Sequence, residues 1–272
     1  MKSSNPIFSR RGFDRPAGAG SAGDHLVNPY AGVGGSSLKE SPTVRMTMTM
    51  DDVIVRTAAT LGTVVLTAAL SWVLLPVDQD ALGRSYGIAV TAAVTAFVLS
   101  LVQTFKRTPS PALILGYAAF EGVFLGVISD TTSTYVAPGV IVQAVLGTFA
   151  VFAGVLIAYR MRWIRVTRRF FGFVLASATG FLLLTAVDLL FSAFGAGNGL
   201  GLGSGGLGVV FGVAGVLLGA CFLALDFKQV EDAIAYGAAR EESWLAAFGL
   251  TATLVWIYLE ALRVLTILRD DT

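Results

Sequence analysis

Four carboxylates lie within or at the end of long apolar stretches, and they are the side chains most able to do chemistry there: Glu121, Asp188, Asp226 and Glu260. A charge at the centre of a bilayer costs about 2.5–3.5 kcal/mol on insertion scales, so it usually pairs, faces water or has a function. Ionised carboxylates bind hard cations such as Ca²⁺ through oxygen, and protonated carboxylates release them. This chemistry could give a pH-gated cation path without histidine.

Asp226 stands where an apolar run ends, directly before Phe227 and Lys228. It is either a charge that marks the membrane edge or a gating, ion-binding carboxylate that faces the interior. Glu231 and Asp232 follow closely, and we expect them in a solvated helix end or loop, with an ion path as the alternative for Glu231.

Glu260 lies about two-thirds of the way along the last apolar stretch, and Arg263 follows three residues later. Residues with this spacing share one helix face and can pair, which lowers the cost of burying either charge. Two interpretations remain open. The pair is purely structural, or Glu260 faces a water-filled path and Arg263 tunes its charge.

The other two acids have no cation nearby in the sequence. Glu121 lies in the middle of its stretch, so it must find a partner on another helix, stay protonated or face water. We favour a functional role for it. Asp188 lies toward the end of its stretch, where it could line an external vestibule or be an interfacial charge.

Seven apolar stretches carry these acids. A bilayer core about 30 Å thick needs about 20 apolar residues in a helix, and strand-like alternation is absent, so helices are the expected spanning structure. The sequence predicts an all-α integral membrane protein, a seven-helix bundle over residues 51–272. The expected spans are Val53–Leu75, Ser85–Thr104, Ala112–Ser129, Pro138–Tyr159, Phe170–Phe194, Leu207–Leu225 and Trp244–Leu268.

Composition excludes several functions. Hydrophobic residues make up 55% of the chain and charged residues 14%, against about 25% charged in soluble domains. The net charge of +1 gives no field that would attract nucleic acid. Cys221 and His25 are the only residues of their types, which argues against an internal disulfide, a multi-cysteine metal site and histidine-based intramembrane catalysis. We therefore expect no enzyme activity and no cofactor beyond transient Ca²⁺.

Residues 1–50 are rich in Gly, Ser, Pro and Arg and lack the apolar core of a secretory signal. We expect a disordered cytoplasmic tail that could dock a protein partner. Basic residues also gather in alternate connections: Lys106 and Arg107, the five arginines between 160 and 169, and Lys228 with Arg240. By the positive-inside rule the N-terminus is cytoplasmic and the C-terminus is outside.

Glycines recur at four-residue spacing, as in Gly122 with Gly126, Gly208 with Gly212, and Gly215 with Gly219. Such pairs let helix backbones approach closely. We expect each pair to lie on a face of its own and to serve packing within the bundle, with dimerisation as the alternative.

The chain resembles the Bax inhibitor (YccA-like, transmembrane Bax inhibitor motif) family in its bacterial branch, over about residues 50–268. The resemblance rests on the seven spans, on Leu225-Asp226-Phe227 and on Ile257-Tyr258-Leu259-Glu260. It implies a bacterial inner membrane location, a bundle with the last helix central, and a pH-sensitive calcium leak.

In that family two aspartates on the last two helices act as the pH sensor. Asp226 matches the first, and Glu260 takes the place of the second, so the resemblance implies that these two gate the path and could bind Ca²⁺. Two features depart from the family pattern: a glutamate replaces the second aspartate, and Arg263 follows it.

Asp226 and Glu260 can meet only if the sixth helix is longer than its apolar run. Glu260 is sixteen residues past Trp244, which is about 24 Å of helix, so an Asp226 at the end of its span could not reach it. The helix must continue past Asp226, and the segment Phe227–Ala239 permits this because it has no proline and one glycine.

Two alternatives to a leak channel stay open. The chain could be an interaction protein that regulates a membrane protease or a stress response. It could also be a proton-coupled transporter in which Glu121 or Glu260 relays protons.

Overall fold

The structure is a computed structural model and describes residues 47–75, 77, 82–136, 138–194 and 200–270. Of the predicted tail, residues 1–46 lie outside this part. Each predicted apolar stretch forms one long helix, and no strand occurs in the described ranges. The helices are α1 Met50–Leu74, α2 Leu82–Phe105, α3 Pro111–Tyr135, α4 Val140–Arg160, α5 Arg168–Ala193, α6 Gly205–Ala235 and α7 Ser243–Asp270, with a short 3₁₀ turn, η1, at Arg240–Glu242 before α7.

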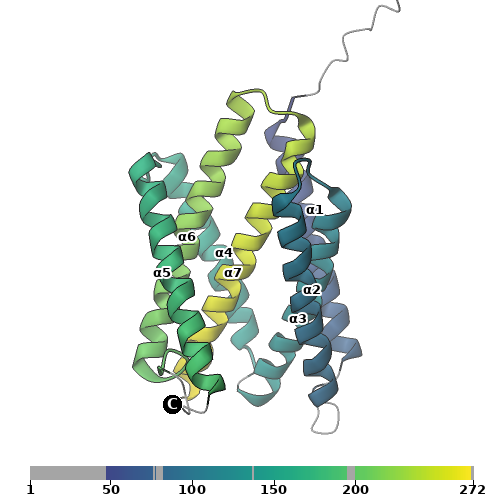
Figure 1. Ribbon diagram of the computed structural model, residues 1–272, viewed down its shortest axis with the longest axis vertical. Helices are drawn as coiled ribbons and strands as arrows, with labels where there is room; N and C mark the ends of the chain where they lie inside the picture. The colour runs from purple at the N-terminus through teal and green to yellow at the C-terminus, as the bar shows by residue number, and fades with distance from the viewer. Residues whose placement is uncertain (1–46, 76, 78–81, 137, 195–199, 271–272) are drawn as a thin grey trace, which may run out of the picture. The chain divides into compact units, whose positions relative to one another are not determined.

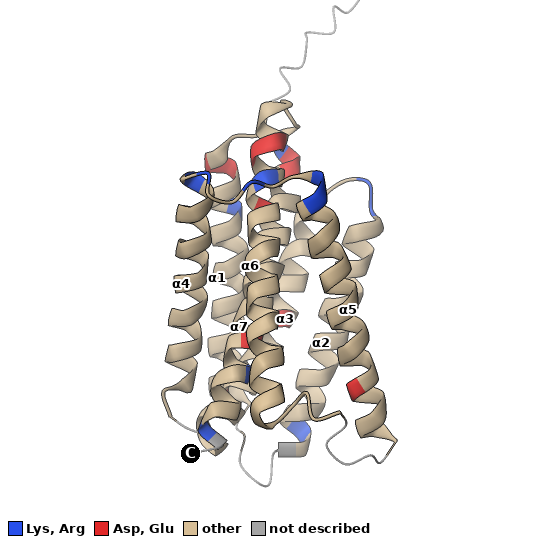
Figure 2. Ribbon diagram, turned by 90° about the vertical axis from the view of Figure 1, so that its left-hand side faces the viewer, with Lys and Arg blue, Asp and Glu red and all other residues tan. Residues whose placement is uncertain are grey.

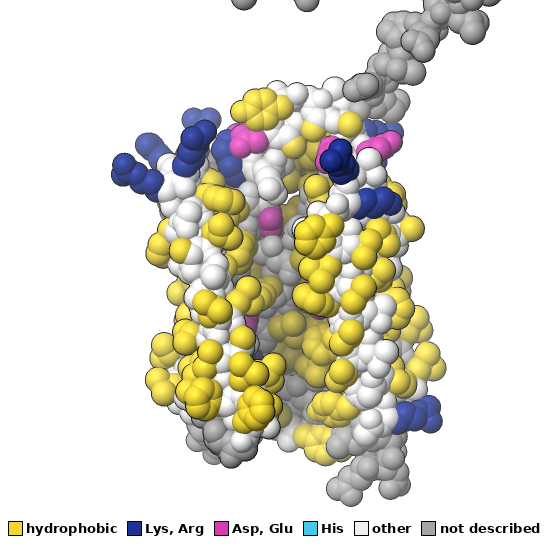
Figure 3. Space-filling view, in the orientation of Figure 1, with side chains coloured by type: hydrophobic (Ala, Val, Ile, Leu, Met, Phe, Trp, Pro, Cys, Tyr) yellow, Lys and Arg dark blue, Asp and Glu magenta, His cyan; other side chains and the backbone are white. Residues whose placement is uncertain are grey.

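All seven long helices are long and apolar enough to cross a membrane. Their outer faces carry many exposed large apolar side chains, among them Leu66 on α1, Phe97 on α2, Phe149 on α4 and Leu183 on α5. Figure 3 shows such side chains covering the face in view. A soluble protein rarely exposes so much contiguous apolar surface. The chain is a multi-pass membrane protein.

The last helix is central, as predicted. α7 packs against α1, α3, α4 and α6, whereas α2 packs mainly on α3 and α5 on α6. Figure 1 shows α7 crossing the bundle between these outer helices. α7 therefore packs against four of the other six long helices.

Local sequence explains where several helices begin. The Thr49 hydroxyl caps α1 by accepting from the Asp52 backbone N–H, and the Asp52 side chain accepts in return. Pro111 opens α3 at a position where its missing N–H costs nothing. Thr167 caps α5 by accepting from the Phe170 backbone N–H.

Most lysines and arginines gather at one end of the bundle (Figure 2). We call it the basic end; it holds the α2–α3, α4–α5 and α6–α7 connections. The α6–α7 connection is also tied to the start of α1 there. Met48 N donates to Ala238 O at 2.8 Å, and Arg240 Nε lies 2.7 Å from Asp52 Oδ1.

Two helices extend more than five residues beyond their predicted ends. α3 runs six residues past Ser129, and α6 runs nine residues past Asp226. The apolar run of α6 stops at Leu225, but its polar end remains helical, and Lys228 pairs with Asp232 one turn later at 2.7 Å. The expected span ended at Leu225, but the continuation past Asp226 that the sequence permits is present, because hydropathy marks the membrane edge and not the helix end.

The glycines of α6 form one stripe and not two faces. A Cβ on Gly208, Gly212, Gly215 or Gly219 would come within 3 Å of an α7 side chain. Steps of four, three and four residues keep to one face of a helix with 3.6 residues per turn. Gly122 and Gly126 likewise face α1. Packing within the bundle, the preferred interpretation, is confirmed for these glycines.

Candidate functional site

Asp226 lies in α6, half-buried, with its side chain against α7. Its Oδ2 accepts a hydrogen bond from Thr253 Oγ1 at 2.6 Å. A Cβ on Gly249 would lie 3.5 Å from Asp226 Oδ1, an ordinary contact distance, so the Asp226 carboxylate lies directly beside Gly249 of α7. No lysine or arginine of the described segments forms an ion pair with it. A neutral hydroxyl is therefore the hydrogen-bond partner of this carboxylate.

Glu260 lies deeper along α7 and faces the glycine stripe. A Cβ on Gly215 would come within 2.7 Å of the Glu260 carboxyl carbon, so the Glu260 side chain packs directly on Gly215 and would have to move if a side chain stood there. Glu260 Oε2 lies 3.7 Å from Arg263 Nη1 and has no hydrogen-bond partner within the described part of the chain. The predicted pairing of Glu260 with Arg263 is present, in a loose geometry.

Arg263 has two further contacts near the end opposite the basic end. Its Nη2 donates to the Leu202 carbonyl oxygen, in the connection before α6. Its guanidinium also lies 5.3 Å from the centre of the Phe211 ring, a favourable cation–π distance. Arg263 therefore links α7 to the α5–α6 connection while its charge faces Glu260.

Asp226 and Glu260 do not meet. The α6–α7 pairing sets Gly215 opposite Glu260 and Asp226 opposite Gly249. Gly249 and Glu260 are eleven residues apart on α7, which is about 16 Å of helix. The expectation that they face each other was wrong although α6 does continue, because the stripe fixes the helix register. The two acids cannot ligate one Ca²⁺ in this conformation.

Glu121 lies half-buried on the α3 face that packs against α7. One turn before it, the Tyr117 ring packs edge-on against Phe248, with centroids 5.1 Å apart. One turn after it, Leu125 shares an apolar cluster with Val255. These contacts set Glu121 at the level of residues 251–252 of α7, close in depth to Asp226.

Sequence reasoning missed the threonines at this depth. Thr251 and Thr60 of α1 are fully buried, and their hydroxyl oxygens lie 2.7 Å apart. Together with Thr253, Asp226 and Glu121 they form a polar layer across α1, α3, α6 and α7. Two threonines separated by one residue in an apolar stretch were the available signal, since a buried hydroxyl needs a partner.

The remaining predicted site residues lie away from this layer. Asp188 of α5 accepts from the Leu200 backbone N–H at 2.7 Å, on a helix that packs mainly on α6. Glu231 is exposed at the basic end, accepts from the Tyr159 hydroxyl and lies 3.8 Å from Lys228 Nζ. Neither residue joins Asp226, Glu121 or Glu260.

A preformed metal cage is not present in the described ranges. No group of three or more His, Cys, Asp or Glu side chains converges there. Asp226 on α6 and Glu121 on α3 therefore stand apart from each other, and each could offer a cation only a transient contact.

Comparisons with known proteins give one informative result. A family model described as "Bax inhibitor 1 like" matches residues 5–270, nearly the whole chain. The search of curated proteins finds no match.

Proposed function

The chain belongs to the Bax inhibitor 1-like family, and on that premise we propose that it is a pH-sensitive leak for Ca²⁺ or other cations. The observation that carries the proposal is the Asp226 carboxylate, which lies inside the membrane domain against the Thr253 hydroxyl and pairs with no described cation. An ionised carboxylate there attracts a cation, and protonation removes the attraction.

Two positions along α7 would control the passage of a cation. The first level is the polar layer with Asp226 and Glu121, nearer the basic end. The second is Glu260, whose charge is offset by Arg263 at 3.7 Å. A cation that passes the first level meets the guanidinium at the second, so we infer that Arg263 is a barrier to conduction in this conformation.

The basic end would face the cytoplasm. Its connections hold most of the lysines and arginines (Figure 2), and such residues stay on the cytoplasmic side of a membrane. This orientation sets Asp226 toward the cytoplasm and Arg263 toward the outside. For a bacterial chain the membrane is the inner one.

The test is Ca²⁺ flux into proteoliposomes that contain the purified full chain, at a series of pH values. We expect flux to rise with pH as Asp226 ionises. The double variant Asp226→Ala with Glu260→Ala should lose this dependence, and the matched variant Glu231→Ala should keep it, because Glu231 is exposed outside the layer. Flux unchanged by the double variant would falsify the proposal.

Glu121 favours a second candidate, proton-coupled transport. It is half-buried and takes part in no hydrogen bond or ion pair with another described residue, which suits a group that gains and loses a proton. Solute uptake driven by a pH gradient and lost in Glu121→Gln supports this candidate. Cation flux that Glu121→Gln leaves intact, with no gradient-driven uptake, rejects it.

A further inference from the structure

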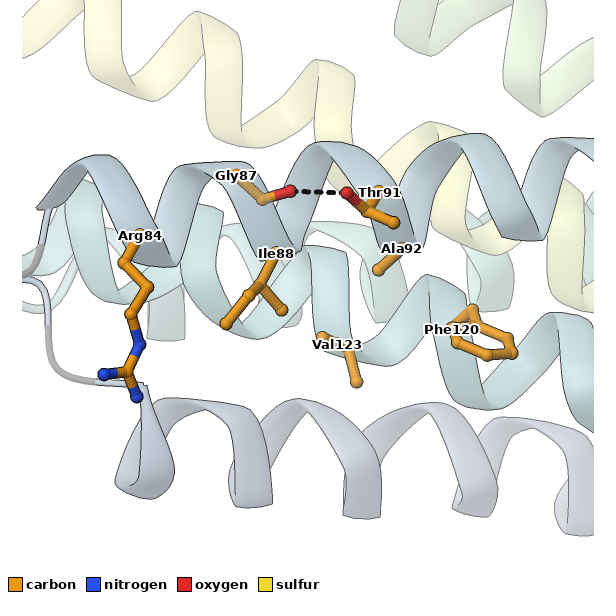
Figure 4. A pocket seen from close by; sticks show the side chains of 7 residues that line it. All are labelled: Arg84, Gly87, Ile88, Thr91, Ala92, Phe120 and Val123. Atoms are coloured by element: carbon orange, nitrogen blue, oxygen red, sulfur yellow. Dashed lines mark hydrogen bonds between the residues drawn. The ribbon is translucent and has the colours of Figure 1, made fainter.

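A groove of about 460 Å³ runs between α2 and α3, outside the polar layer. Its lining is Arg84, Gly87, Ile88, Thr91, Ala92, Phe120 and Val123 (Figure 4). Ile88 and Phe120 are 37% and 41% exposed, so the groove opens at the surface that the bilayer covers.

The walls of the groove are apolar. The hydroxyl of Thr91 donates to the Gly87 carbonyl of its own helix at 2.7 Å (Figure 4), so it presents its methyl group and offers no free donor. Gly87 has open space where a Cβ would stand. Such a wall suits a hydrocarbon chain and gives a polar ligand nothing to bond.

One end of the groove is charged. Arg84 extends across it from α2 (Figure 4), and no hydrogen bond or ion pair joins Arg84 to another described residue. It is the third residue of α2, at the end of the bundle away from the basic end, where an arginine reaches the headgroup level of the bilayer.

We propose that this groove binds one anionic phospholipid, with its phosphate on Arg84 and an acyl chain along the apolar wall. Residues 84–92 of α2 span about 12 Å, which fits within the roughly 15 Å half-thickness of a bilayer core. A guanidinium binds phosphate oxygens in a bidentate manner. Charge at one end and hydrocarbon along the rest match a phospholipid and not a polar solute.

The test is native mass spectrometry of the full chain in detergent with added phosphatidylglycerol or phosphatidylcholine. The wild type should retain one phosphatidylglycerol. We expect Arg84→Gln to lower this retention about tenfold. The variant loses one charge-assisted contact with the phosphate, and a loss of about 1.4 kcal/mol lowers affinity tenfold. Gly87→Leu should lower the retention of both lipids by filling the groove. Gly154→Leu is the matched control, since Gly154 is an exposed α4 glycine that also has open space at the Cβ position.

Any of three outcomes overturns the proposal. In the first, Arg84→Gln and Gly87→Leu both retain phosphatidylglycerol as the wild type does. In the second, Gly154→Leu loses as much lipid as Gly87→Leu. In the third, the wild type is a dimer that Gly87→Leu converts to a monomer, so that a second copy of the chain occupies the groove. Melting temperatures of all variants, measured alongside, separate loss of lipid from loss of folding.

Discussion

Thr253 of α7 donates a 2.6 Å hydrogen bond to Asp226 of α6, inside the helical bundle of a membrane protein. The bond joins the central helix to the carboxylate that the family resemblance implicates in pH sensing. It also ties that carboxylate to a neutral partner, which leaves its charge uncompensated whenever it ionises.

Asp226→Asn should abolish the pH dependence of cation flux while the protein stays folded. The amide is close in size to the carboxylate and can still accept from Thr253, but it does not titrate. Flux measured in proteoliposomes between about pH 6 and pH 8 checks this, a window around physiological pH in which a tuned acid would act. Asp232→Asn is the control, since Asp232 pairs with Lys228 beyond the apolar run. A pH profile that survives in Asp226→Asn contradicts the assignment.

Thr253→Val should lower stability by about 1–3 kcal/mol, because it removes the donor and leaves a half-buried carboxylate without a partner. Thr253→Ser keeps the hydroxyl and should recover most of the loss. Thermal unfolding of the purified variants in one detergent measures the difference. If the valine variant is as stable as the serine variant, the hydrogen bond contributes nothing.

Arg263→Leu should increase cation flux severalfold, because it removes the positive charge 3.7 Å from Glu260 and the link to the Leu202 carbonyl. Arg263→Lys keeps the charge and should stay near the wild-type rate. The two variants are compared at a pH where the wild type conducts. Equal flux through both would show that the guanidinium is no barrier.

Gly219→Ala should destabilise the bundle by about 1–3 kcal/mol, as overpacking usually does. Its Cβ would come within 2.5 Å of Cγ1 of the fully buried Ile257. Gly154→Ala, with open space around it, should be neutral or slightly stabilising, because alanine is the better helix former. Equal melting temperatures for the two variants would show that α6 and α7 can separate without cost.

Cysteine labelling tests the orientation. In a chain with Cys221→Ala, we expect Ser204→Cys to react with a membrane-impermeant maleimide in intact cells. Arg162→Cys at the basic end should react only after the membrane is opened, because basic connections stay cytoplasmic. The reverse pattern places the N-terminus outside.

The sequence by itself determined the class of protein and the approximate position of every helix. Apolar length was sufficient because a spanning segment must satisfy its backbone internally and cross about 30 Å of hydrocarbon. It also located Glu121, Asp226 and Glu260 within or beside the spans, and it indicated from their spacing on one helix that Glu260 and Arg263 can pair.

Only the tertiary structure decided which acidic residues lie at the same depth along the helix bundle. The register of α6 against α7 is set by close contacts at Gly212, Gly215 and Gly219, and no one-dimensional pattern specifies how far two helices slide along each other. That register separates Asp226 from Glu260 and brings Thr253 to Asp226. The depth that Glu121 shares with Asp226 likewise follows from the packing of α3 on α7, because contacts between distant segments depend on side-chain shape and not on hydropathy.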